Sequence, residues 1–238
     1  SAAQAQPYVD KFVAAAASYE GDGLDILNRR ARILNALPIG VVLTLAATGS
    51  EMNNGAVITH AATRTKYAFM SERLFPVFAI LDPTRTFTLD GRQISNGIVD
   101  AFVHVVEQYL TFPVNSPVQD RFAEGLLLTL IEQGPKALSH PRDYDVRANL
   151  MWTASLALNG LIGSGVPHDW ATHMIGHELT ALYVIDHART LAVVLPSMMK
   201  VRKDAKREKL LQYAERVWGL TDGEDDQRIR YAIARTSR

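Results

Sequence analysis

Three histidines fall within one short segment of the sequence, DWATHMIGHELTALYVIDH at residues 169–187. His173 and His177 are four residues apart, so in an α-helix their side chains project from the same face. His187 lies much further along, and an unbroken helix would separate it from His173 by about 21 Å. The imidazoles of His173 and His187 can therefore meet only if the chain turns back between them.

The sequence contains a suitable break before His187. Tyr183, Val184 and Ile185 have weak helix propensity, and Asp186 is a favourable N-cap for a new helix that begins at His187. We therefore expect a helix–turn–helix arrangement that directs the imidazoles inward.

A second polar pair occurs upstream, in the segment GIVDAFVHVVEQY. Asp100 and His104 are also four residues apart, on a helix face that Gly97 and Ala101 make apolar. A carboxylate buried there without a partner would be costly, and binding one divalent metal ion together with three histidines would remove that cost. Zn²⁺ and Fe²⁺ both accept carboxylate oxygen and imidazole nitrogen. Each pair taken alone is also explained by a structural hydrogen bond or by surface histidines.

The pattern of apolar residues divides the chain near residue 90. From residue 91 to residue 238, apolar residues recur at intervals of three and four, which predicts a bundle-like helical domain whose first helix is capped by Ser95. Residues 1–90 contain a helix-like segment, VDKFVAAAASY, and two strand-like segments, GVVLTLA and FPVFAILDP, typical of a small α/β layer. The predicted fold class is therefore mainly α, with a small α/β part on the N-terminal side.

The composition excludes several other classes of site and partner. Lys and Arg total 25 and Asp and Glu total 25, so the zero net charge gives no reason to expect nucleic acid as a partner. Cysteine is absent, which excludes disulfides and thiolate metal sites and favours the cytoplasm. No apolar run reaches the roughly 18 residues of a membrane span, so no membrane association is expected.

Several motifs together resemble the iron-containing (group III) alcohol dehydrogenases. They are TGSE, LDP with a following TL, NGIVDAFVHVVEQY, and DWATHMIGHELTA with a later DH, and the likeness extends from Phe12 to Trp218. The resemblance implies a dehydroquinate-synthase-like fold, in which an α/β domain binds the dinucleotide and a helical domain binds one Zn²⁺ or Fe²⁺ ion. It also implies hydride transfer between NAD(P)H and an aldehyde or primary alcohol, performed by a cytoplasmic homodimer.

The resemblance assigns a role to individual residues. The family's metal ligands correspond to Asp100, His104, His173 and His187, and His177 corresponds to a histidine beside the nicotinamide and substrate that does not bind metal. NADP(H) is the expected cofactor, with NAD(H) as the alternative. An apolar substrate pocket for short to medium aliphatic aldehydes is expected from Val103, Trp152 and Leu161. The implied cofactor-binding residues are Thr44, Thr48, Gly49, Ser50, Asn53 and Lys66.

One motif of the family has no counterpart in this sequence. Its glycine-rich pyrophosphate turn would fall at or before residue 1, so we expect the chain to be an internal portion that lacks most of the nucleotide-binding domain. Two other functions stay open. A metal-dependent hydrolase would use the same ion to activate water, although Glu178 points about 100° away from His177 on a helix. A non-catalytic helical module would use the metal only to hold helices together.

Overall fold

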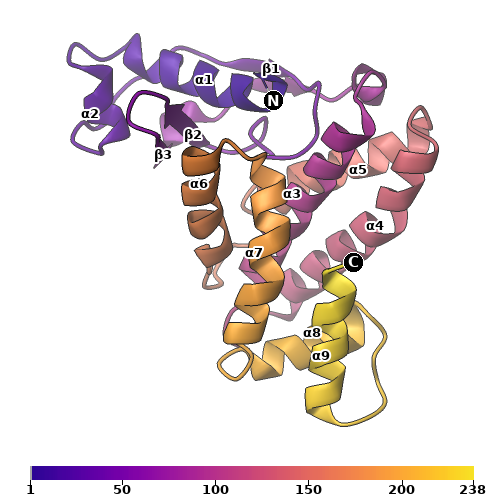
Figure 1. The fold of residues 1–238 in the computed structure, drawn as a ribbon. Coiled ribbons are helices and arrows are strands. Elements are labelled where there is room, and N and C mark those ends of the chain that lie inside the picture. The colour runs from indigo at the N-terminus through magenta and orange to yellow at the C-terminus, as the bar shows by residue number, and fades with distance from the viewer. Residues whose placement is uncertain (1) are drawn as a thin grey trace.

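Helices dominate the structure, as the sequence predicts (Figure 1). This computed structural model describes residues 2–238, with side chains from Tyr8 onward, so the expected position of the pyrophosphate turn lies outside the described residues. None of the described helices is both long enough and apolar enough to cross a lipid bilayer. The α-helices are α1 (Ala2–Ala16), α2 (Gly23–Leu27), α3 (Gly91–Tyr109), α4 (Pro117–Ser139), α5 (Tyr144–Ala157), α6 (Ala171–Tyr183), α7 (His187–Val201), α8 (Arg207–Arg216) and α9 (Asp225–Thr236).

The strands form two small sheets. Strands β1 (Gly40–Val42) and β4 (Phe78–Ile80) pair in parallel, which confirms that the two strand-like segments belong to one α/β layer, although each strand is shorter than predicted. Strands β2 (Gly55–His60) and β3 (Thr65–Met70) form an antiparallel hairpin. The hairpin is not predicted from the sequence, because its strands are half-buried along most of their length and lack a clear alternation of apolar and polar residues.

The start of α3 differs from the sequence prediction. Asp90 is the N-cap, and its carboxylate accepts a hydrogen bond from the backbone N–H of Gln93 at 2.8 Å. The prediction that Ser95 caps this helix is wrong, because Ser95 lies inside it and donates its hydroxyl to the carbonyl of Gly91. An acidic cap one turn earlier satisfies the free N–H groups and lets the helix begin at Gly91.

The turn between α6 and α7 confirms the predicted break. Helix α6 ends at Tyr183, Val184 adopts a left-handed conformation with φ of 57°, and α7 begins at His187. Asp186 occupies the N-cap position but makes no capping hydrogen bond with its side chain. Its carboxylate instead accepts two hydrogen bonds of 2.6 Å each from Arg92 and one of 3.1 Å from Asn96, so it ties the turn to α3.

Helix α3 is the central element of the helical part. It packs against α4, α5, α6 and α7, and Figure 1 shows it between the α4–α5 side and α7. The main hydrophobic core surrounds it, and Ala101 and Val105 are completely buried there. A smaller core lies beneath α1 and contains Phe69 of the hairpin and Val41 of β1. The predicted division at residue 90 stays a prediction; the strands of the described residues all precede it, and their α-helices other than α1 and α2 follow it.

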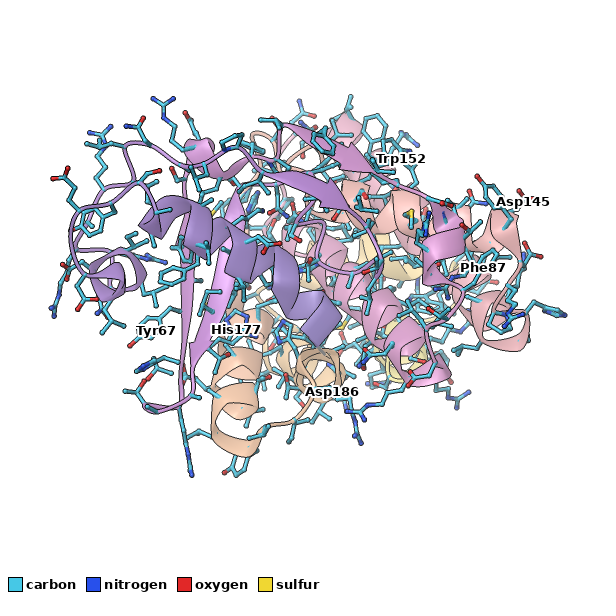
Figure 2. All side chains as sticks on the ribbon, turned by 90° about the horizontal axis from the view of Figure 1, so that it is seen from above. Tyr67, Phe87, Asp145, Trp152, His177 and Asp186 are labelled. Atoms are coloured by element: carbon cyan, nitrogen blue, oxygen red, sulfur yellow. The ribbon has the colours of Figure 1, made fainter. Side chains whose placement is uncertain are left out.

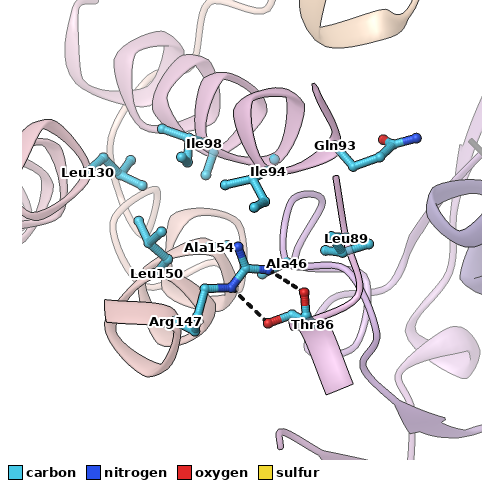
Figure 3. Close-up of a pocket in the computed structure, with 12 residues that line it drawn as sticks. Ala46, Thr86, Leu89, Gln93, Ile94, Ile98, Leu130, Arg147, Leu150 and Ala154 are labelled. Carbon is cyan, nitrogen blue, oxygen red and sulfur yellow. Dashed lines mark hydrogen bonds between the residues drawn. The ribbon is translucent and has the colours of Figure 1, made fainter. Parts of the chain in front are cut away.

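A buried arginine joins the α/β layer to the helices. Arg147 of α5 donates from Nε to the hydroxyl of Thr86 at 2.9 Å and from a terminal nitrogen to the Thr86 carbonyl at 2.8 Å. Thr86 ends the short 3₁₀ helix η2 (Pro83–Thr86) that follows β4. The pair lies at the edge of a small cavity that Ala46, Ile94 and Ala154 help to line (Figure 3).

The loop after β1 crosses α3 at a glycine. A Cβ atom at Gly97 would lie 2.2 Å from the carbonyl oxygen of Ala46, so no larger residue fits there without displacing the loop. Gly97 precedes Asp100 by less than one helical turn, and this close approach therefore brings the loop to the part of α3 that carries the polar pair.

We predict that Gly97→Ala lowers the free energy of unfolding by about 1–3 kcal/mol, because the new methyl group forces the loop away from α3. Gly125→Ala is the matched control, since nothing lies within 4 Å of its Cβ position on α4. That control should raise stability by about 0.5–1 kcal/mol, as alanine favours helix more than glycine. Urea unfolding measures both, and equal effects of the two substitutions would contradict the close approach.

Candidate metal centre

Polar residues at four-residue intervals follow one face of α3. Two of them, Asp100 and His104, have exposed fractions of only 2% and 4%. Their neighbours along the stripe serve structural contacts, with Arg92 and Asn96 holding Asp186 and Gln108 donating to the carbonyls of His104 and Ala157. Helix α3 therefore presents a buried carboxylate and imidazole toward α6 and α7.

The structure brings the predicted ligands together around the Asp100 carboxylate. Its Oδ1 atom lies 3.9 Å from Nε2 of His104, 3.8 Å from Nε2 of His173 and 3.7 Å from Nε2 of His187. Donor atoms of Asp100, His104 and His173 all lie within 4.8 Å of one another. His187, at the start of α7, lies near the same oxygen. The break before it therefore brings His187 back toward His173, as the spacing of the histidines predicts.

The arrangement of these atoms fits a metal ion. Separations of 3.7–3.9 Å are too long for hydrogen bonds, and Oδ1 of Asp100 and Nε2 of His173 are buried without any hydrogen-bond partner. Two ligand atoms at the usual distance from one tetrahedral Zn²⁺ ion lie about 3.4 Å apart. A slight contraction of the cluster around an ion would thus satisfy polar atoms that otherwise carry an uncompensated burial cost.

The electrostatics of the cluster favour neutral imidazoles at His104 and His187 beside the ionised carboxylate of Asp100. Burial lowers the pKa of His104 to about 4, although the charge of Asp100 opposes the shift. Burial also lowers the pKa of His187 well below its usual value. Burial alone would raise the pKa of Asp100, but the surrounding imidazoles outweigh it and hold that pKa below its usual range. Neutral imidazoles keep the lone pairs that metal binding requires.

His173 is held by a carboxylate that the sequence does not single out. Glu107 of α3 is buried and accepts hydrogen bonds from Nδ1 of His173 and from the backbone N–H groups of Thr172, at 2.6 Å, and His173, at 3.3 Å. Burial lowers the pKa of His173, but its contacts with Asp100 and Glu107 raise it to about 9. Glu107 lies one helical turn after His104. Its place on the same helix face as Asp100 and His104 was the sequence signal that could have identified it.

His177 stands beside the cluster and not within it. Its ring lies 4.9 Å from the ring of His187 and 6.0 Å from that of His173, and among the described residues no ion pair joins it to Asp100, unlike His104, His173 and His187. Burial and the nearby positive charge of Lys66 lower its pKa to about 3, so His177 is neutral at physiological pH. The structure thus places His177 beside the cluster of Asp100, His104, His173 and His187, and the roles of these residues stay predictions.

The predicted cofactor residues lie on two segments next to this cluster. Thr48, Gly49, Ser50 and Asn53 belong to the loop that crosses α3, and the hydroxyl of Thr48 donates to that of Ser50 at 3.1 Å. Gly49 has φ of 60°, and its Cβ position would lie 3.2 Å from the carbonyl of Ala154 on α5. Thr44 is exposed directly after β1.

Lys66 lies on the hairpin, close enough to Asp100 and His177 for their charges to influence one another. It lies on β3, which packs against α6, and burial lowers its pKa to about 8 while the charge of Asp100 opposes the shift. Figure 2 shows His177 close to the hairpin strands beneath α1. The hairpin, the loop and α6 therefore all border the region around His177.

The residues expected to form an apolar substrate pocket are not brought together. Val103 is buried and lines a cavity between α3, α4, α7 and α9, to which none of the described histidines contributes. Trp152 is 52% exposed on α5, far from His177 in Figure 2, and Leu161 is 44% exposed. Glu178, the general base that a hydrolase would need, is exposed on α6. It therefore gives the hydrolase interpretation no support.

Comparison with known proteins gives matches along most of the chain. A family profile described as "Fe-containing alcohol dehydrogenase family, C-terminal" matches residues 94–236, and one described as "Iron-containing alcohol dehydrogenase" matches residues 9–83. The NADPH-dependent aldehyde reductase YqhD of Escherichia coli is 62% identical over 95% of this chain and 59% of its own length. The probable NADH-dependent butanol dehydrogenase 1 of Bacillus subtilis is 43% identical over 92% of this chain and 57% of its own length.

A solved structure repeats the fold. The crystal structure of Escherichia coli YqhD superposes with a TM-score of 0.96 at 60% identity, covering 97% of this chain and 60% of that one. The chain thus spans about three fifths of the length of the relatives that it matches.

We predict that Glu107→Gln weakens Zn²⁺ binding by roughly 10- to 100-fold, because the amide removes the charge that orients and polarises His173. Competition with a chromogenic chelator measures the affinity. Glu124→Gln is the matched control, since Glu124 is a similarly buried carboxylate that accepts from Tyr109 at 2.9 Å, in contact with α8. Unchanged zinc affinity in the Glu107 variant would contradict a role in orienting His173.

Proposed function

The chain belongs to the iron-containing alcohol dehydrogenase family, and from this premise we propose that the protein is a metal-dependent alcohol dehydrogenase or aldehyde reductase. It transfers hydride between NAD(P)H and a small aldehyde or primary alcohol. The observation that carries the proposal is the convergence of three imidazole Nε2 atoms on Oδ1 of Asp100, at 3.7–3.9 Å. A buried carboxylate among imidazoles is a ligand set for a divalent cation.

The proposed ligands are Asp100, His104, His173 and His187. When bound there, Zn²⁺ or Fe²⁺ supplies Lewis-acid chemistry to a carbonyl or alcohol oxygen. Asp100 offsets part of the positive charge and selects a divalent cation over a monovalent one. Glu107 fixes the ring of His173, and Arg92 fixes the turn that carries His187, so these side chains orient the ligands before the ion arrives.

His177 has the proposed role of moving a proton beside the metal centre. With a pKa lowered to about 3, it does not store a proton at neutral pH. A neutral imidazole can still accept a proton at one nitrogen while it donates from the other, which moves a proton to solvent without a lasting charge. Its position next to His187, outside the ligand set, suits this role.

The cofactor is proposed to bind between the loop and the hairpin. Thr44, Thr48, Gly49 and Ser50 would contact it from the loop, and Lys66 would face it from β3 with a positive charge. The names of the relatives include both NADPH-dependent and NADH-dependent enzymes, and we propose NADP(H) with NAD(H) as the alternative. A cytoplasmic homodimer with no nucleic-acid or membrane partner completes the proposal.

We predict that His187→Ala removes most of the bound metal and nearly all turnover, because the cluster loses the one ligand that α7 contributes. Elemental analysis of the purified protein in its full natural length, with NADPH oxidation in the presence of an aldehyde, measures both. His140→Ala is the control, since His140 is exposed at the end of α4. Full metal content and turnover in the His187 variant would remove His187 from the ligand set.

We predict that His177→Ala keeps the metal but slows turnover by roughly 100-fold or more, the usual contribution of a positioned proton-transfer group. The same two measurements separate binding from chemistry. Loss of the metal in this variant would show that His177 is itself a ligand.

A further inference from the structure

A fully buried lysine on α1 has no part in the metal centre. Lys11 has no exposed surface. Its Nζ atom donates to the backbone carbonyl of Asn53 at 2.7 Å, to Oδ1 of Asn53 at 3.1 Å and to the carbonyl of Gly55 at 2.9 Å. A lysine ammonium has three hydrogens, so these contacts use all of its donors.

The contacts continue from Lys11 into the loop that holds the proposed cofactor residues. Oδ1 of Asn53 also accepts from the backbone N–H of Gly55 at 3.1 Å, and Nδ2 of Asn53 donates to the carbonyl of Thr48 at 3.2 Å. The hydroxyl of Thr48 in turn donates to Ser50. One chain of hydrogen bonds therefore runs from the ammonium on α1, through the Asn53 side chain, to the Thr48–Ser50 turn.

The opposite side of the loop is held by α5. Glu51 is buried and accepts a hydrogen bond from the hydroxyl of Ser155, and Gly49 lies against the carbonyl of Ala154. Lys11 on α1 and Ser155 on α5 thus both form hydrogen bonds with the same short loop, although the two helices are distant in sequence. The carboxylate of Glu51 also stabilises the ammonium of Lys11 electrostatically.

A lysine in this position is costly unless its partners stay in place. Burial lowers the pKa of Lys11 to about 7, against the influence of Glu51. The cost of burying an ammonium is offset only while all of its acceptors remain aligned, and without Lys11 the two carbonyls would lose a charged donor. The lysine and the loop conformation therefore depend on each other.

We propose that Lys11 is the positioning residue of the cofactor loop, and that it acts with Asn53 to fix the Thr48–Ser50 turn against which the nicotinamide cofactor binds. This inference rests on the proposed function, because it assigns a purpose to the shape of that loop. Asn53 then supports the loop from inside and does not serve mainly as a direct contact to the cofactor. Neither residue touches the metal ligands.

The test is Lys11→Met in the protein of full natural length, with NADPH as the ligand. Methionine keeps the length and apolar stem and removes the charge and all three donors. We expect the dissociation constant for NADPH, measured by fluorescence, to rise about tenfold or more, a loss of about 1.4 kcal/mol. Metal content should stay at the wild-type value, and the turnover number at saturating NADPH should change far less than the affinity.

Lys209→Met is the matched control. Lys209 is also a buried lysine, and it donates to Asp120 at 2.8 Å and lies over the ring of Tyr109, in contacts that join α8 to α3 and α4. This control should reduce stability but leave NADPH affinity unchanged. A loss of NADPH affinity in the control equal to that in the Lys11 variant would mean that general destabilisation causes both, and would overturn the proposal.

Hydrogen exchange gives a readout that does not depend on the cofactor. Amides of residues 48–55 should exchange faster in Lys11→Met than in the wild type, while those of α6 and α7 should not. Wild-type exchange and wild-type NADPH affinity together would overturn the proposal. If the methionine variant does not fold, Lys11→Gln, which keeps two donors, decides by the same criteria. Absence of NADPH binding by the wild-type protein would instead refute the proposed function, and the exchange data would still test the support of the loop.

Discussion

The burial of one carboxylate determines how the helices must pack. Asp100 lies on the central helix with an exposed fraction of 2%, and a charge in that position is unfavourable without compensation. Imidazoles from α3, α6 and α7 surround it at 3.7–3.9 Å. The turn between α6 and α7 must therefore occur where it does, because only then can residues of both helices reach the same oxygen atom.

Further polar contacts hold this arrangement in place. Glu107 fixes His173, and the bidentate contact between Arg92 and Asp186 fixes the turn before His187. Lys11 plays the corresponding part for the neighbouring loop. In each case a charged side chain that is not itself a proposed ligand or cofactor contact binds atoms of a site residue or of the turn beside one, which keeps the site rigid.

Much of the proposed site was accessible from sequence because it depends on helical periodicity. Residues four apart on a helix share a face whatever surrounds them, so Asp100 with His104 and His173 with His177 could be paired in advance. The weak helix formers before Asp186 indicated the turn, and the resemblance to the iron-containing alcohol dehydrogenases, now confirmed by the family matches, joined the two pairs. The mainly helical fold followed from the same periodicity.

The sequence by itself determined which residues share a helix face and where the helices break, because these depend on local backbone geometry. Only the tertiary structure decided which charged and polar side chains from distant parts of the sequence face each other. Glu107 on His173, Arg92 on Asp186 and Lys11 beneath Asn53 join residues separated by 42 positions or more, and no local pattern encodes such contacts. The cap at Asp90 and the β2–β3 hairpin were missed for a related reason, since competing local signals are resolved by how the whole chain packs.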